Sequence, residues 1–99
     1  MRNIDLQSLL VFLTRMEMYI YPCNKQNIVS FITGYESGAQ GECTFTQDLS
    51  KKLSVKYNIK KYATGWSNQI DRYSEEKNIQ WVHAFVLITS ELLNESKET

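Results

Sequence analysis

Apolar side chains recur three and four residues apart through most of this 99-residue chain, and no other feature constrains its fold more. Such spacing places side chains on one face of an α-helix. The first stripe consists of Leu6, Leu9, Leu10, Leu13 and Met16, and the second of Ile28, Phe31, Ile32 and Tyr35. An alternating stretch at residues 43–46 is too short to found a sheet. The sequence therefore predicts an all-α fold: one domain, spanning residues 1–99, built as a bundle of about five helices.

Residues that favour helix ends mark the limits of the first three predicted helices. Asn3 and Asn24 are expected to act as N-caps, because a short polar side chain can accept a hydrogen bond from the first turn. Gly38 is expected to end the second helix in the left-handed conformation. Thr44 and Gln47 have the spacing of a capping box, in which two side chains satisfy each other's backbone donors, and this predicts the start of the third helix.

Two further helices complete the predicted bundle. The third helix carries apolar residues up to Tyr57, and residues 57–63 then predict a turn or a short irregular segment. Thr64 and Gly65 are expected to open the fourth helix, whose apolar face is Trp66, Ile70 and Tyr73. Asn78 is expected to open the fifth and longest helix, with a stripe made of Val82, Phe85, Val86, Leu92 and Leu93.

The composition is that of an ordinary globular domain. Hydrophobic residues make up 42% of the chain and charged residues 22%, which excludes a disordered or collagen-like protein. No apolar run approaches the roughly 18–20 residues that cross a membrane, and residues 1–5 lack the apolar core of a secretory signal. We therefore expect a cytoplasmic protein with no membrane partner. In that compartment Cys23 and Cys43 are expected to be free structural thiols.

No set of residues in the sequence points to catalysis. Residues 38–42 are rich in glycine but lack the following Lys and Ser/Thr of a phosphate-binding loop. Catalysis by a Cys–His pair would require a cysteine beside His83 and a third group to orient it, and a histidine on a core helix is more often structural. The two cysteines also lack zinc-ligand spacing. We expect a protein that is not an enzyme and has no cofactor, metal or small-molecule substrate.

The charges of this neutral chain are unevenly distributed. Residues 1–48 have a net charge of −2, residues 49–70 of +5, and residues 71–99 of −3. The basic middle holds Lys51, Lys52, Lys56, Lys60 and Lys61, interleaved with tyrosines. Lysines on phosphates and aromatic rings on bases would suit single-stranded nucleic acid. Five charges on a neutral protein fall short of the strongly basic character of such proteins, so a nucleic-acid-binding or regulatory role for the segment from Lys51 to Lys61 is the alternative hypothesis.

Two short motifs resemble a recurrent bacterial pattern. They are RMEMYI at residues 15–20 and FITGY at residues 31–35, separated by Ile28 among others. Where the pattern has Pro-Gly before Met-Tyr, this chain has Met16-Glu17, and its proline follows at Pro22. From about Leu6 to Leu93 the chain is similar to the small helical immunity proteins of contact-dependent growth inhibition and related polymorphic toxin systems. Within these motifs we expect Gly34 to let its helix pack closely on a neighbour.

This resemblance implies a cytoplasmic antidote that binds the C-terminal domain of a cognate toxin and covers its active site or substrate-binding surface. Many such toxins are nucleases, and we expect a ribonuclease. A nuclease presents a basic cleft, so its inhibitor is expected to offer acidic groups with aromatic anchors beside them. The expected toxin-binding residues are Tyr35, Glu36, Glu42, Asp71, Tyr73, Glu75 and Glu76.

Overall fold

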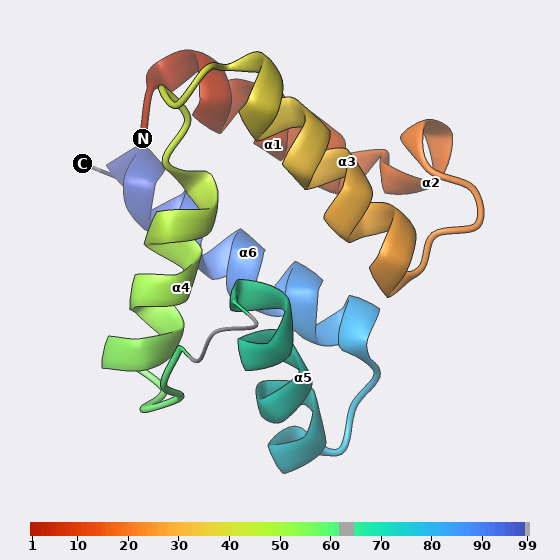
Figure 1. The fold of residues 1–99 in the computed structure, drawn as a ribbon, viewed down its shortest axis with the longest axis vertical. Coiled ribbons are helices and arrows are strands. Elements are labelled where there is room, and N and C mark those ends of the chain that lie inside the picture. The colour runs from red at the N-terminus through yellow and green to blue at the C-terminus, as the bar shows by residue number, and fades with distance from the viewer. Residues whose placement is uncertain (62–64, 99) are drawn as a thin grey trace.

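The apolar stripes form helices in a computed structural model, which describes residues 1–61 and 65–98 (Figure 1). Six helices and no strand occur within these residues, so the predicted all-α bundle is confirmed. The helices are α1 (Asn3–Thr14), α2 (Met16–Tyr19), α3 (Lys25–Gly38), α4 (Phe45–Val55), α5 (Trp66–Lys77) and α6 (Trp81–Glu98). The first predicted stripe is divided between two helices, because Arg15 leaves the helical conformation and Met16 begins a separate turn.

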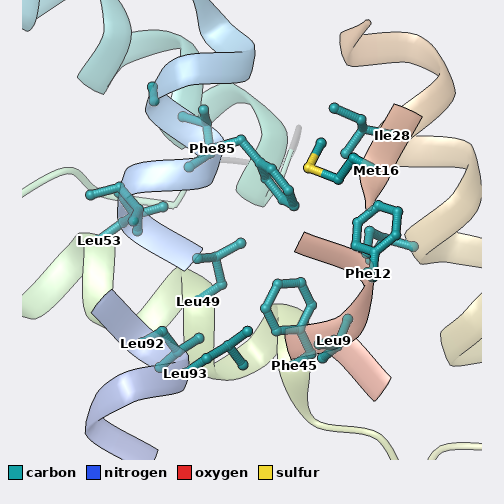
Figure 2. Close-up of a cluster of buried hydrophobic side chains, with 14 of the residues drawn as sticks. Leu9, Phe12, Met16, Ile28, Phe45, Leu49, Leu53, Phe85, Leu92 and Leu93 are labelled. Carbon is teal, nitrogen blue, oxygen red and sulfur yellow. The ribbon is translucent and has the colours of Figure 1, made fainter. Parts of the chain in front are cut away.

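The core is assembled around α6. This helix runs through the middle of the molecule in Figure 1, and α1, α4 and α5 make the closest backbone approaches to it. Figure 2 shows side chains from α1–α4 and α6 converging on one cluster, namely Leu9, Phe12, Met16, Ile28, Phe45, Leu49, Leu53, Phe85, Leu92 and Leu93. The radius of gyration is 12.7 Å, close to the ~13 Å of a compact 100-residue domain. None of the described helices is both long and apolar enough for a bilayer.

Of the three asparagines expected at helix starts, Asn24 is confirmed, and the predictions for Asn3 and Asn78 are wrong. The Oδ1 atom of Asn24 accepts a hydrogen bond from the backbone N–H of Asn27 at 2.9 Å. Asn3 is instead the first residue inside α1, preceded by Arg2 at the cap position. Asn78 has φ 55° and ends α5 in the left-handed conformation. Asparagine tolerates this conformation better than most residues, so the same side chain can end a helix as well as begin one.

The connection between α3 and α4 also differs from prediction. Helix α3 does end at Gly38, but the positive φ angles fall on Gln40 (53°) and Gly41 (84°). Thr44 occupies the N-cap position of α4 without making a side-chain cap, because its hydroxyl donates to Asp48. The capping-box prediction is therefore wrong, and another residue supplies the cap of α4.

That residue is Glu36 of α3. One carboxylate oxygen of Glu36 accepts a hydrogen bond from the backbone N–H of Thr46 at 2.9 Å, and the other accepts from the Thr46 hydroxyl at 2.7 Å. A negative charge at a helix N-terminus satisfies a free N–H group and interacts favourably with the helix dipole. Glu36 thus fixes the start of α4 against the end of α3.

A buried amide joins α4 to α5. The side-chain nitrogen of Gln69 donates to the carbonyl oxygen of Ile59 at 2.8 Å, and its oxygen accepts from the hydroxyl of Ser50 at 2.6 Å. Residues 57–61 follow α4 without regular helix, as predicted, whereas residues 62–64, including Tyr62 and Thr64, lie outside the described part of the chain. Gly65 takes the N-cap position of α5, as expected.

The expectation for Gly34 is wrong within this chain. A Cβ atom added at Gly34 would meet no heavy atom within 4 Å, so no neighbouring helix of the described structure requires a glycine there. The residue is exposed and lies in the interior of α3.

Candidate functional site

The seven residues expected to bind a toxin do not form one surface. Tyr35, Glu36 and Glu42 lie at the end of α3 and in the connection to α4, at the top of Figure 1. The other four belong to α5, whose C-terminal end lies at the bottom of the same view. The expected acidic surface is therefore divided between opposite ends of the molecule.

The group at the end of α3 is engaged in hydrogen bonds within the chain. Arg2 binds both carboxylate oxygens of the fully buried Asp5, at 2.7 and 2.9 Å, and also binds Glu42 at 2.6 Å. The hydroxyl of Tyr35 donates to the same Asp5 carboxylate at 2.7 Å. The hydrogen bond from Arg2 holds the pKa of Asp5 below its ordinary value of 3.8. Together with the cap made by Glu36, these contacts connect α3 to the N-terminus and to α4.

The group on α5 contains two acids that form no ion pair with any other residue that the structure describes. Asp71 pairs with Lys25 at 2.5 Å, which connects α5 to the start of α3. Tyr73 is 8% exposed and packs edge-on against Tyr57, with 5.1 Å between the ring centroids. Two acids, Glu75 and Glu76, are exposed, and no ion pair within 4 Å holds either of them in the described part of the chain.

Two of the five lysines of the basic segment are neutralised by α6. Lys52 is almost completely buried and pairs with Glu91 at 3.3 Å and Glu95 at 2.7 Å, and Lys56 also pairs with Glu91. The hydrogen bond from Lys52 holds the pKa of Glu95 below its ordinary value. The hydroxyl of Tyr57 donates to Glu91 at 2.5 Å, so this ring belongs to the same network. The basic segment therefore exposes only Lys51, Lys60 and Lys61 as unpaired lysines of the described residues.

The structure instead reveals an apolar groove between α1 and α3. Its floor includes the rings of Phe12 and Phe31, which stack in parallel with 4.4 Å between centroids. The ring of Tyr19 is tilted against both, with 6.2 Å between its centroid and that of Phe12 and 6.0 Å to that of Phe31. The groove has a volume of about 330 Å³ and is lined by Ser8, Leu9, Val11, Phe12, Tyr19, Phe31 and Tyr35.

The stretches of α1 and α3 that form the walls of this groove carry no charged side chain. Ile4, Ser8 and Val11 lie on one face of α1, since they are four and three residues apart, and Ile4 and Val11 are both exposed. Residues 6–14 of α1 and 26–35 of α3 include no charged side chain. We call this surface the α1–α3 face and define it by Ile4, Ser8, Val11, Tyr19, Phe31 and Tyr35. Loss of charge and enrichment in aromatic rings distinguish the core of a protein interface from the rest of a surface.

Sequence reasoning missed this face, although a signal was present. The two charge-free stretches are visible in the sequence, and Ile4 and Val11 fall outside the first apolar stripe. Apolar residues outside the buried stripe of a helix have no place in the core, so they indicate a second contact surface.

A second cleft, of about 400 Å³, lies where α1 and α2 meet α6, and Cys23 forms part of its wall. Burial raises the pKa of the Cys23 thiol, and Glu17 raises it further. A raised pKa leaves little of the nucleophilic thiolate at neutral pH. His83, expected to be a structural residue on a core helix, is exposed on α6. Within the described residues, no three potential ligands gather in a way that could hold a metal ion.

Comparisons with family models, with curated proteins and with solved structures find no match for this chain. Two features meet at the α1–α3 face. The face has the composition of an interface core. It also takes Tyr19 from the first motif of the bacterial pattern and Phe31 and Tyr35 from the second.

Proposed function

We propose that this protein binds a toxin domain and neutralises it by stoichiometric occlusion, with the α1–α3 face as the centre of the contact. The observation that carries the proposal is the uncharged, aromatic groove in which the two motifs of the immunity-protein pattern meet. Aromatic residues in a desolvated centre commonly dominate the binding energy of an interface. On this proposal the protein acts in the cytoplasm, where it meets a toxin delivered by a neighbouring cell.

Occlusion requires a larger contact than the groove alone. A stable protein interface takes about 800 Å² from each partner. The α1–α3 face would therefore form the centre, and the surrounding polar residues a rim that excludes water. Such an inhibitor needs no chemistry of its own, because covering the active site or the substrate-binding surface of the toxin is sufficient.

A nuclease is the toxin class that we propose, and the exposed acids of α5 support it. Glu75 and Glu76 have no ion pair within the described structure, so their charge is available to a basic partner. Charges outside a contact can still attract an oppositely charged partner over several ångströms, which accelerates association and makes it sensitive to salt. We therefore propose that these two residues accelerate the approach of the toxin, whereas the α1–α3 face supplies most of the binding free energy.

Co-expression tests the proposal directly. The product of the gene immediately upstream, or its last ~150 residues, about one domain, would be expressed with and without this protein. We expect the fragment alone to stop growth, and this protein to restore growth and to co-purify as a 1:1 complex. A harmless fragment, or growth arrest that this protein does not relieve, would contradict the proposal.

A matched pair of variants separates the two surfaces. Tyr19→Ala should accelerate dissociation of the complex, since it removes a ring from the groove. Glu75→Gln with Glu76→Gln should instead slow association at low salt and flatten its salt dependence. Both effects can be measured by surface plasmon resonance at several salt concentrations. Equal effects of the two changes on dissociation would contradict the division of roles.

A further inference from the structure

We infer that the element of the toxin that occupies the α1–α3 face is an α-helix, whose uncharged apolar side lies in the groove and against Gly34 and Gly38 of α3. This inference rests on the proposed function and names the chemistry of the partner at that site. Four properties of the face support it: its lack of charge, its helical walls, its glycines and its length.

The lack of charge defines the polarity of the occupant. No charged side chain lies in residues 6–14 or 26–35, the stretches that form both walls of the groove. A charge from the partner would lose its water here and find no counterion, which is strongly unfavourable. The matching surface of the partner is therefore apolar or neutral.

The walls define the secondary structure of the occupant. Both walls are helices, α1 and α3, whose backbone N–H and C=O groups are paired within each helix. They offer no strand edge to which an extended segment could add by backbone hydrogen bonds. The recognition mode that suits an apolar groove between helices is an amphipathic helix that inserts side chains one turn apart.

The glycines indicate how closely the occupant approaches. Phe31, Gly34, Tyr35 and Gly38 follow one another at positions i, i+3, i+4 and i+7, so both glycines share a stripe with two rings of the groove. Neither glycine has a neighbour within 4 Å of the place where a Cβ would be. Glycine weakens the interior of a helix, and no contact within the described structure requires one at Gly34. A partner backbone lying against this stripe would explain it.

The length of the stripe fits a short helical contact. From Phe31 to Gly38 the stripe advances about 10 Å, which is two turns of helix. A second hollow, of about 370 Å³, is lined by Arg2, Gly34, Tyr35, Gly38 and Ala39. Tyr35 borders both hollows, and the charge of Arg2 at the second is already paired with Asp5 and Glu42.

Two matched pairs of variants test this inference in the complex of the whole protein with the toxin domain. Gly34→Leu places a large side chain on the stripe. Thr33→Leu places the same side chain on the adjacent exposed residue, which points to a different side of α3. Val11→Glu places a charge in the groove, whereas Val55→Glu places it on an exposed valine of α4. We expect Gly34→Leu and Val11→Glu each to weaken binding by about tenfold or more, as loss of an interface hot spot does. The dissociation constants of both controls should lie within about twofold of the parent value, well below the tenfold change that ~1.4 kcal/mol represents.

Each outcome decides one question. If the complex forms and its affinity is unchanged by Gly34→Leu and by Val11→Glu, the inference is overturned and the proposed function stands. If no complex forms at all, both are overturned. A dimer of this chain that Gly34→Leu dissociates would show that a second copy occupies the face, and this too would overturn the inference. Hydrogen exchange on the toxin should show protection of a helical segment with neutral residues at i, i+3, i+4 and i+7. Protection confined to an extended or charged segment would refute the helical occupant.

Discussion

Replacement of Gly34 by alanine should stabilise the free protein. Alanine is favoured over glycine in a helix interior by about 0.8–1.0 kcal/mol, because glycine loses more backbone freedom on folding. Gly34 lies within α3, is exposed, and leaves at least 4 Å of open space around an added Cβ, so no steric penalty offsets this gain. For a domain of this size, ~1 kcal/mol raises the melting temperature by about 4–8 °C.

Thermal and urea denaturation followed by far-ultraviolet circular dichroism would measure this effect. The matched control is Gly41→Ala, because Gly41 has φ 84°, a conformation that costs other residues about 1–2 kcal/mol. The control should therefore lower the melting temperature. A Gly34→Ala variant that melts at or below the parent temperature would refute the reasoning, since it would show that the glycine already serves the fold.

Three further changes test the structural roles assigned above. The pKa of Asp5 is depressed in the folded protein, so its carboxylate stabilises the fold fully above the ordinary pKa of 3.8, and this stability is lost as the pH falls through the pKa of the folded state. Urea denaturation at several pH values from about 5 to 2 should show this loss of stability. The Asp5→Asn variant should show a smaller dependence of stability on pH. Glu36→Ala should lower the free energy of unfolding in urea by about 1 kcal/mol, because α4 loses its cap. The buried hydroxyl of Thr89 has no hydrogen-bond partner among the described residues, so Thr89→Val should raise that free energy by about 1 kcal/mol, and an unchanged urea midpoint would argue against it.

The helices were predictable because their cause is local. Spacing of three and four residues determines which side of a helix is buried, and every residue of the first stripe except Leu10 and Leu13 is buried in the structure. The helix ends were less predictable, because several groups compete for the same donors. The cap of α4 comes from Glu36, ten residues earlier on another helix, and no local pattern at Thr44 announces it.

The expected site failed to gather on one surface for a similar reason. Electrostatic reasoning from sequence treats each acid as available to a partner. Glu42 and Asp71 instead pair with Arg2 and Lys25, which are 40 and 46 residues away along the chain. Such pairings depend on the tertiary fold, so neither composition nor local charge pattern reveals them. The charge-free stretches were visible in the sequence, but their meaning required knowing that α1 and α3 lie side by side.

The polar contacts at the two ends of α3 connect this helix to the rest of the molecule. Lys25 and Asp71 hold the start of the helix, while Tyr35, with Asp5, holds its end. Exposed ion pairs contribute at most about 1 kcal/mol to stability, so the Lys25 pair matters little for folding. The hydrogen bond from Tyr35 to Asp5 joins α3 to α1, which are the two walls of the groove, whereas the Lys25–Asp71 pair joins α3 to α5. A groove whose walls are already fixed loses less conformational freedom when a partner enters it, which favours affinity. On the proposed function, these polar contacts would orient an uncharged surface for the partner, and the partner would not need to touch them.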